Sequence, residues 1–305
     1  MRNNTPQQLQ GDPQGSRLHT PVLLEQVVAL LDPKSGERYL DLTAGYGGHA
    51  SAIVSRIGNA GLAVLVDRDD NAIRELAPLK ERGAEVMHQD FATAAHDLVE
   101  QGEQFDMVLV DLGVSSPQLD RAERGFSFAQ EGPLDMRMDQ SQTRSAYDLV
   151  NKASEDELMH IIRDYGEEYS AMARRIASAI VKSRPLATTT ALAAAVLRAY
   201  GPGYRKRHPA TRTFQAIRIA LNDELGQVQR LLPLLPHLLR PGGRVAIISF
   251  HSLEDRLVKQ YFADQAASGY EAELAILTKK PIRGATDDVH NPRARSAMLR
   301  AAVKK

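Results

Sequence analysis

The chain has 305 residues, no cysteine and 38 residues of each charge sign. The length fits one large domain or two small ones, and the lack of cysteine excludes disulfide bonds and thiolate chemistry. No run of 18 apolar residues is present, so no membrane-spanning helix is predicted. Residues 1–17 are rich in Asn, Gln, Gly and Pro and predict a disordered tail rather than a secretory signal, which makes the cytoplasm the expected location.

Apolar periodicity predicts alternating strands and helices through the first third of the chain. In chain order we expect a helix over 21–31, strands over 38–42 and 62–67, a helix over 71–82, and strands over 85–88 and 105–111. The strands are continuous apolar runs, which is typical of strands that are buried on both faces. Such an alternation predicts a mainly parallel sheet with helices on both faces.

The alternation stops after the fourth strand, and helical signals dominate the next 70 residues. Ser154 and Glu157 have the spacing of a capping box that opens a helix, and further helices are expected over 171–182 and 190–200. A strand over 244–250 then resumes the α/β pattern. The sequence therefore predicts an α/β fold with a smaller helical domain inserted into it.

The expected domain limits follow from this interruption. Residues 18–140 and 213–305 are assigned to the sheet domain, and residues 141–212 to the inserted helical domain. Ligands of open parallel sheets bind where the carboxyl ends of the strands meet. We therefore expect the functional residues on the loops that follow the strands.

A glycine turn between the first two strands carries the clearest signal for a ligand. Gly45 and Gly47 follow the first strand, and glycine lets the backbone turn sharply and approach a ligand closely. Asp67 ends the second strand, 22 residues after Gly45, where a carboxylate can accept hydrogen bonds from both ribose hydroxyls. The arrangement predicts a nucleoside-cofactor site.

The turn alone does not select the cofactor, because Gly45, Gly47 and Ala50 also match the looser dinucleotide fingerprint. Asp41 helps to choose. At the mouth of the turn its carboxylate would repel the phosphates of a nicotinamide dinucleotide and attract the ammonium and sulfonium groups of S-adenosylmethionine. We favour the methyl donor over NAD; the alternative for Asp41 is a strand-end carboxylate without a ligand.

The zero net charge conceals a basic sector. Residues 169–222 include ten basic residues and no Asp or Glu. A polyanionic partner is one explanation, and a solvated helical surface is the other. Arg205, Lys206 and Arg207 lie between glycine and proline residues, so we expect an exposed loop that contacts phosphates without reading sequence, with Arg212 close behind.

Eight ordered motifs link these observations to a known family. They are His19–Leu24 (HTPVLL), Asp41–His49 (DLTAGYGGH), Asp111–Asp120 (DLGVSSPQLD), Arg124–Phe128 (RGFSF), Asp135–Asp139 (DMRMD), Thr211–Arg218 (TRTFQAIR), Ile248–Arg256 (ISFHSLEDR) and Asn291–Ser296 (NPRARS). From about Leu18 to the C-terminus the chain thus resembles the MraW (RsmH) family of bacterial methyltransferases. The ordered set is far more specific than the glycine turn alone.

The resemblance implies a Rossmann-like class I methyltransferase fold with S-adenosylmethionine as cofactor. It also implies methyl transfer to the N4 amine of a cytosine in the decoding region of 16S ribosomal RNA, with the small ribosomal subunit as partner. Carried over position by position, the donor-binding residues are Gly47, Gly48, His49, Asp67, Phe91, Asp111 and Gln118. Backbone N–H groups of 47–49 would meet the methionine carboxylate at a helix N-terminus, and Phe91 would lie on the adenine face with Asp90 near the exocyclic amine.

The catalytic candidates are Asp111 and His251. The loop after Asp111 lacks the double proline and aromatic residue that many amino-methyltransferases of nucleic acids have there, so their arrangement cannot be transferred. With no cysteine and no H-x-x-x-H spacing, no metal site is expected. Two other classes remain open from the residues alone: a nicotinamide oxidoreductase, and an RNA-binding protein without catalytic activity.

Overall fold

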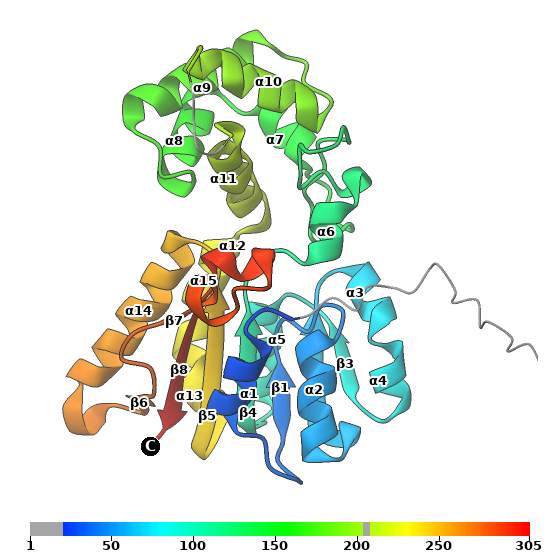
Figure 1. Ribbon diagram of the computed structural model, residues 1–305, viewed down its shortest axis with the longest axis vertical. Helices are drawn as coiled ribbons and strands as arrows, with labels where there is room; N and C mark the ends of the chain where they lie inside the picture. Colours follow the sequence, from blue (N-terminus) through cyan, green and yellow to red (C-terminus); the bar gives the residue numbers. More distant parts are fainter. Residues whose placement is uncertain (1–20, 204–207) are drawn as a thin grey trace, which may run out of the picture.

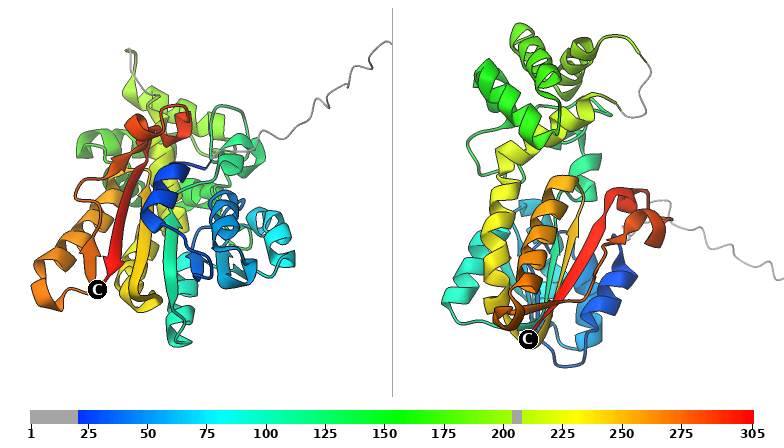
Figure 2. Two further views of the ribbon diagram at one scale, coloured as in Figure 1. Left: turned by 60° about the horizontal axis from the view of Figure 1, so that its bottom comes forward. Right: turned by 90° about the vertical axis from the view of Figure 1, so that its left-hand side faces the viewer.

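The computed structural model describes residues 21–203 and 208–305. A sheet covered by helices forms one end of the molecule, and a module of helices stands over the carboxyl edge of its parallel strands (Figures 1 and 2). Within the described ranges, no helix combines the length and the hydropathy needed to cross a membrane.

The sheet has eight strands in the order β3-β2-β1-β4-β5-β8-β6, with β7 paired to β8. The first five are parallel to one another, as predicted, whereas β8 is antiparallel to its neighbours. The strands are β1 (Tyr39–Asp41), β2 (Ala63–Asp67), β3 (Glu85–His88), β4 (Phe105–Asp111), β5 (Leu239–Ser249), β6 (Leu274–Ile276), β7 (Ile282–Arg283) and β8 (Met298–Lys304).

Helices cover both faces of the sheet, as the continuous apolar strands predict. Successive strand residues point to opposite faces: Tyr39 packs with one helical layer and Leu40 with the other. One layer comprises α1 (Leu24–Leu31), α2 (Gly48–Ile57), α3 (Asp70–Glu75) and α4 (Ala77–Glu81). The other comprises α5 (Phe91–Glu100), α12 (Glu224–Leu231), α13 (Leu235–Leu238) and α14 (Ser252–Ala267).

Several predicted element limits are wrong. The expected helix over 71–82 is two helices, α3 and α4, because Pro78 has no N–H to continue the ladder and lies in the first turn of α4. The strand predicted over 244–250 begins earlier, at Leu239, where β5 pairs with Phe105 across a bulge. Ser154 caps α8 as predicted, but Glu157 completes no capping box.

The inserted module has its own apolar core. Its helices are α7 (Ala146–Lys152), α8 (Glu155–Tyr165), α9 (Ser170–Lys182), α10 (Thr189–Tyr200) and α11 (Ala210–Asn222). Some members of this core lie outside the predicted limits. Before residue 141 they are Phe126, Leu134, Met136 and Met138, and after residue 212 they are Phe214 and Ile217 of α11. Packing therefore carries the module beyond the predicted limits of 141 and 212 on both sides. Two short helices, α6 (Ser116–Asp120) and α15 (Gly284–Asp287), lie in strand-end loops.

Asn222 ties together the two segments that connect the module to the sheet domain. Its side chain accepts a hydrogen bond from the backbone N–H of Met138 at 2.9 Å and donates to the carbonyls of Met136 and Arg218. Its own carbonyl accepts hydrogen bonds from Arg68 and Gln227. One buried amide thus fixes the entry and the exit of the inserted module.

Asn222→Ala is expected to destabilise the protein by at least about 2 kcal/mol, because it leaves buried backbone groups of both connections without partners. Urea unfolding measures this loss. The exposed residue Gln229, one helix further on, supplies the control: Gln229→Ala should stay within about 0.5 kcal/mol of wild type. Equal stabilities of the two variants would contradict this role of Asn222.

Candidate functional site

A cavity of about 910 Å³ opens where the strand-end loops of the sheet face the inserted module. Its walls come from the loops after β1, β2, β4 and β5, from α11 and from the segment before β8. The sequence-predicted residues that line it are Gly48, His49, Asp67, Phe91, Asp111, Gln118 and His251. The structure therefore brings most of the predicted site together in one place.

The glycine turn leads into the N-terminus of α2, which no side chain of the described residues caps. A helix N-terminus favours an anion such as a carboxylate, because its first N–H groups and the helix dipole point toward it. Gly47 is not among the cavity-lining residues; its φ of 76° turns the chain into the helix. Gly48 lines the cavity, and a Cβ there would lie 2.6 Å from Pro21, so a side chain would collide with the preceding segment.

Asp67 is held in place by the turn that it faces. One carboxylate oxygen accepts a hydrogen bond from the Gly45 N–H and the other from the Asp69 N–H, both at 2.8 Å. Each oxygen keeps a second lone pair for a further donor. Burial raises the pKa of Asp67 despite these two backbone hydrogen bonds. The geometry fits the predicted acceptor of two ribose hydroxyls.

The predicted role of Asp41 is wrong. Its side chain is buried below the cavity, with 1% exposure, and accepts hydrogen bonds from the Tyr39 hydroxyl and the Thr43 N–H. It does not line the cavity. Burial raises the pKa of Asp41 to about 7. The strand end of β1 therefore turns its carboxylate inward, which the sequence pattern did not reveal.

Asp111, and not Asp41, is the strand-end carboxyl that lines the cavity near the glycine turn. It ends β4 and lines the cavity, and its Oδ1 is buried without a hydrogen-bond partner among the described residues. Oδ2 lies 3.6 Å from Nδ1 of His49, whose Nε2 contacts the carbonyl of Val22. Burial, followed by the charges of Asp41 and Glu254, raises the pKa of Asp111 well above its ordinary value. A buried acceptor without a donor calls for a partner, which a ligand or a proton on the carboxyl itself would supply.

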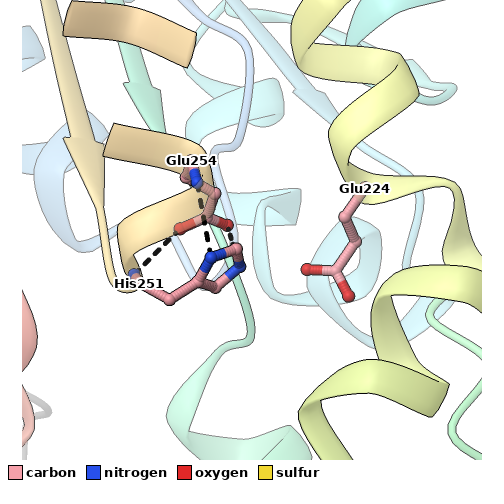
Figure 3. Close-up of side chains that lie close together, drawn as sticks. All are labelled: Glu224, His251 and Glu254. Atoms are coloured by element: carbon pink, nitrogen blue, oxygen red, sulfur yellow. Dashed lines mark hydrogen bonds and ion pairs between the residues drawn. The ribbon is translucent and has the colours of Figure 1, made fainter. Parts of the chain in front are cut away.

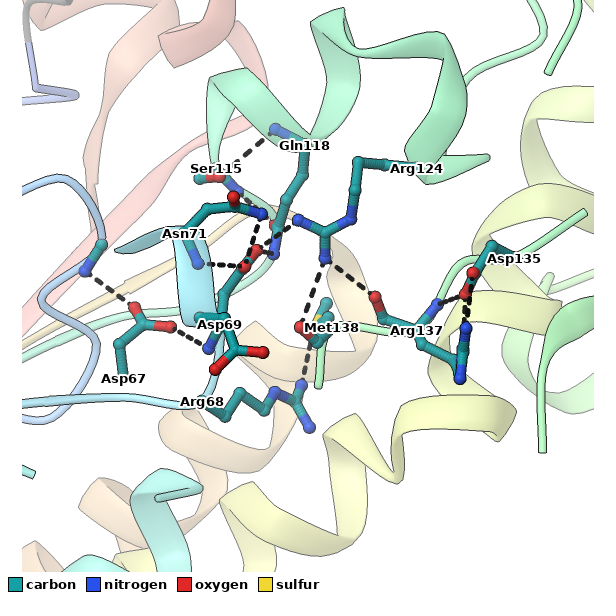
Figure 4. A network of polar contacts seen from close by, with 12 residues as sticks. Asp67, Arg68, Asp69, Asn71, Ser115, Gln118, Arg124, Asp135, Arg137 and Met138 are labelled. Carbon is teal, nitrogen blue, oxygen red and sulfur yellow. Dashed lines mark hydrogen bonds and ion pairs between the residues drawn. The ribbon is translucent and has the colours of Figure 1, made fainter. Parts of the chain in front are cut away.

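Gln118 has a structural partner on each end of its amide. Its nitrogen donates to Asp69 at 2.7 Å and its oxygen accepts from the Ser115 N–H at 2.9 Å. Arg124 donates to the same Asp69 oxygen at 2.6 Å and to the carbonyls of two residues at the start of the module (Figure 4). This buried network joins the loops after β2 and β4 to the module, so Gln118 shapes the cavity wall.

Phe91 begins α5, and the ring packs partly against the core and partly against the cavity. Asp90, which was expected near the exocyclic amine of the adenine, is the N-cap of α5. Its Oδ1 accepts from the N–H groups of Ala92 and Thr93, and its Oδ2 accepts from the Thr93 hydroxyl. Its neighbours Gln89 and Phe91 line the cavity, and its contact with an amine stays a prediction.

His251 lies on the cavity wall, where it contacts the buried Glu254 and has the buried Glu224 nearby (Figure 3). It is the N-cap of α14, where Nδ1 accepts from the Glu254 N–H at 3.4 Å and Nε2 lies 3.2 Å from Glu254 Oε1. Ligand atoms of His251, Glu254 and Glu224 come within 4.8 Å of one another. Arg218, however, donates to both oxygens of Glu224 at 2.8 Å, so the donor set is that of an ion pair rather than of a cation site.

Sequence analysis missed one wall of the cavity, the face of α11. Thr211, Phe214, Gln215 and Arg218 line it at the i, i+3, i+4, i+7 spacing of a single helical face. They belong to a motif recognised in the sequence, but the helix itself was not predicted. Arg293, from the segment before β8, adds a further wall and forms an ion pair with Asp120.

The basic residues of the predicted sector have different surroundings in the structure: some form ion pairs and others are exposed. Arg205, Lys206 and Arg207 lie outside the described residues. Arg212 is exposed, forms an ion pair with Glu168 at 3.5 Å and does not line the cavity. Arg218 is committed to its buried pair with Glu224. The outer surface of the module retains other exposed cations, among them Arg174, Arg175 and Lys182 on α9.

The parallel sheet, the uncapped N-terminus of α2 and the strand-end carboxylates define an α/β protein that binds a nucleoside cofactor at the carboxyl edge. Comparison with known proteins narrows this class. The MraW methylase family matches residues 16–305 of the chain. The chain belongs to this family, and its methyl donor is S-adenosylmethionine.

Two relatives at about 45% identity carry names that agree with the family. The chain is 45% identical to the ribosomal RNA small subunit methyltransferase H of Nitratidesulfovibrio vulgaris, over 99% of this chain and 91% of that protein. It is 46% identical to the protein of the same name from Synechocystis, over 94% and 93% of the two chains. A solved methyltransferase homologue from Pyrococcus horikoshii is 17% identical, with a TM-score of 0.43 over 92% of this chain and 66% of that one.

Affinity for S-adenosylmethionine is expected to rise with pH, over a range that lies above the one in which an ordinary aspartate ionises. Burial raises the pKa of Asp111, so the ionisation that creates an attraction for the cationic donor is displaced to higher pH. Calorimetry across the range measures the slope. Asp111→Asn should abolish it, and Asp41→Asn should move it to lower pH by removing a nearby negative charge. An identical slope in all three proteins would refute this linkage.

Proposed function

We propose that this protein transfers a methyl group from S-adenosylmethionine to the N4 amine of a cytosine in the decoding region of 16S ribosomal RNA, within the small ribosomal subunit. The relatives' names support ribosomal RNA of the small subunit as the substrate. The observation that carries the choice of an amine is Asp111, a strand-end carboxyl that lines the cavity and has one oxygen, Oδ1, without a donor among the described residues. An exocyclic amine would supply that donor.

The donor would occupy the side of the cavity formed by the β1 and β2 loops. Backbone N–H groups of Gly48 and His49 would bind its carboxylate, and Asp67 would bind its ribose hydroxyls. Phe91 would lie against its adenine. Asp111 Oδ2, beside His49, would face its ammonium group. The Asp111 carboxyl and His251 would then lie beside the space that remains for the base.

S-adenosylmethionine supplies a methyl group on a positively charged sulfur; the amine nitrogen bonds to this carbon as the carbon–sulfur bond breaks and the sulfur keeps the electron pair. Asp111 Oδ1 would orient the amine and accept the proton that the nitrogen loses. The raised pKa of Asp111 suits a proton acceptor. The surrounding walls hold the two reactants in line and exclude water.

A cytosine stacked in a helix cannot reach this cavity, so the target base would be unstacked or already single-stranded. The inserted module would hold the flanking RNA through its phosphates. Arg205, Lys206, Arg207 and Arg212 are our candidates for these contacts, together with the exposed cations of α9.

Nucleoside mass spectrometry tests the proposed reaction. Small subunits from cells that lack the gene, incubated with the protein and S-adenosylmethionine, should gain one N4-methylcytidine in 16S rRNA. The catalytically impaired Asp111→Asn protein should give less product. Methylation at another atom or another type of base would contradict the proposal.

Asp67→Ala should weaken S-adenosylmethionine binding at least about tenfold, because hydrogen bonds to a charged acceptor contribute about 1.5–3 kcal/mol each. Calorimetry measures the affinity, and circular dichroism checks that the turn and the fold survive. Asp70→Ala removes a neighbouring carboxylate that does not line the cavity and should bind as wild type does. Unchanged affinity in a folded Asp67→Ala protein would place the ribose elsewhere.

Replacing Arg205, Lys206 and Arg207 together by Ala should weaken binding to 16S rRNA and flatten its salt dependence, because phosphate contacts release counterions. The affinity for S-adenosylmethionine should not change. A matched variant with Ala at the exposed residues Arg56, Lys80 and Arg82 of the sheet domain removes the same charge. If both triple variants lose RNA affinity equally, the effect is one of net charge and not of this segment.

A further inference from the structure

The chain concentrates its phenylalanines at the cavity. Five of the seven line it: Phe91, Phe126, Phe128, Phe214 and Phe250. The rings of Phe128 and Phe214 pack on each other with a centroid distance of 4.8 Å. The guanidinium of Arg124 lies over the ring of Phe126 at 5.7 Å. Within the described ranges, no ring–ring or cation–ring contact involves Phe91 or Phe250, so these two rings remain for flat groups of the two reactants.

The order of the strands places Phe250 beside the expected donor. The sheet order β3-β2-β1-β4-β5 sets five features in a row along the carboxyl edge, with neighbouring strands about 4.8 Å apart. In that order they are Phe91, Asp67, the glycine turn, Asp111 and Phe250. The proposed donor uses the first four, from its adenine to its ammonium group. Phe250 is therefore the next feature beyond Asp111, on the side away from the adenine.

The ring of Phe250 packs against the loop that follows Asp111. Strands β4 and β5 pair so that Ile248 lies opposite Asp111, and Phe250 comes two residues later. A Cβ at Gly113, two residues after Asp111, would lie 3.4 Å from Cδ2 of the Phe250 ring. The loop itself, residues 112–125, contains no aromatic residue. The aromatic ring next to Asp111 thus comes from the neighbouring strand.

The position of this ring is set by the protein before a ligand binds. The backbone N–H of Phe250 donates to Glu254 Oε2 at 2.8 Å, which ties it to the first turn of α14. The ring is partly buried against the core on one side of the sheet, and it also lines the cavity. A ring held in this way loses little freedom when a ligand packs on it.

We propose that the target cytosine stacks on the ring of Phe250. Unstacked bases of RNA are commonly held on aromatic side chains, and one such contact contributes substantially to binding. Stacking fixes the plane of the base, and N4 lies in this plane, one strand spacing from Asp111. This inference rests on the proposed function and names the residue that orients the base. Phe250 gives affinity and orientation without base identity, because every base has an aromatic face.

A cycle between protein and RNA tests the contact. The RNA is one that the wild-type protein methylates, made with either cytidine or an abasic ribose at the methylated position. Binding is measured with S-adenosylhomocysteine present, so the readout does not depend on turnover. Phe250→Leu removes the aromatic face and keeps an apolar side chain, whereas Phe250→Tyr keeps the face.

Removal of the base should weaken binding to wild type at least about fivefold more than binding to Phe250→Leu, because the two changes remove the same stacking contact. Phe250→Tyr should behave as wild type does. Phe128→Leu is the same substitution at a cavity ring that already packs on Phe214, and it should retain the wild-type dependence on the base. Unchanged S-adenosylhomocysteine affinity shows that each variant is folded.

A second measurement uses the wild-type protein alone. The RNA carries 5-iodocytidine at the methylated position, and ultraviolet light joins such a base to an aromatic side chain that it contacts. Trypsin releases Phe250 in the peptide that spans residues 245–256. Mass spectrometry should find the cross-link in this peptide, at Phe250.

Two results would overturn the inference. The first is an equal effect of base removal on wild type and on folded Phe250→Leu. The second is the absence of residues 245–256 from the cross-linked peptides. Either result leaves the proposed reaction standing if wild type still forms N4-methylcytidine. If wild type methylates no cytosine, the proposed function fails, and the inference fails with it.

Discussion

A buried ion pair between Asp69 and Arg124 holds the whole site together. Their side chains are 2% and 3% exposed and lie 2.6 Å apart, and Gln118 donates to the same carboxylate oxygen. Burial opposes the ionisation of Asp69, but Arg124 and the other donors hold its pKa below the ordinary value. Removing one partner of such a pair leaves an uncompensated buried charge. The pair therefore fixes the β2 loop, the β4 loop and the start of the module relative to one another.

That constraint explains why the cavity has walls from distant parts of the chain. Asp69 lies two residues after Asp67 and donates its N–H to the Asp67 carboxylate, so the donor side is tied to the segment that leads into the module. Asn222 fixes the return of the module on the opposite side. The face of α11 is consequently held against the strand-end loops and forms one wall of the cavity.

Much of this arrangement could be predicted from the sequence. Continuous apolar strands and the glycine turn predict the parallel sheet, and Asp67 and Asp111 follow because strand ends meet at one edge. The orientation of Asp41 could not be predicted, since a strand-end carboxylate can face the cavity or the core. The partners of Arg218 and His251 were equally hidden, because both depend on contacts between segments that only the tertiary packing brings together.

The central claim is that donor and base meet at Asp111. A crystal structure of the protein with S-adenosylhomocysteine and its RNA substrate tests this most directly. The account predicts an unstacked cytosine in the cavity, with N4 within hydrogen-bond distance of Asp111 Oδ1 and on the line that the transferred methyl group would take from the sulfur. A cytosine bound outside this cavity, or an Asp111 that contacts only the donor, would contradict it.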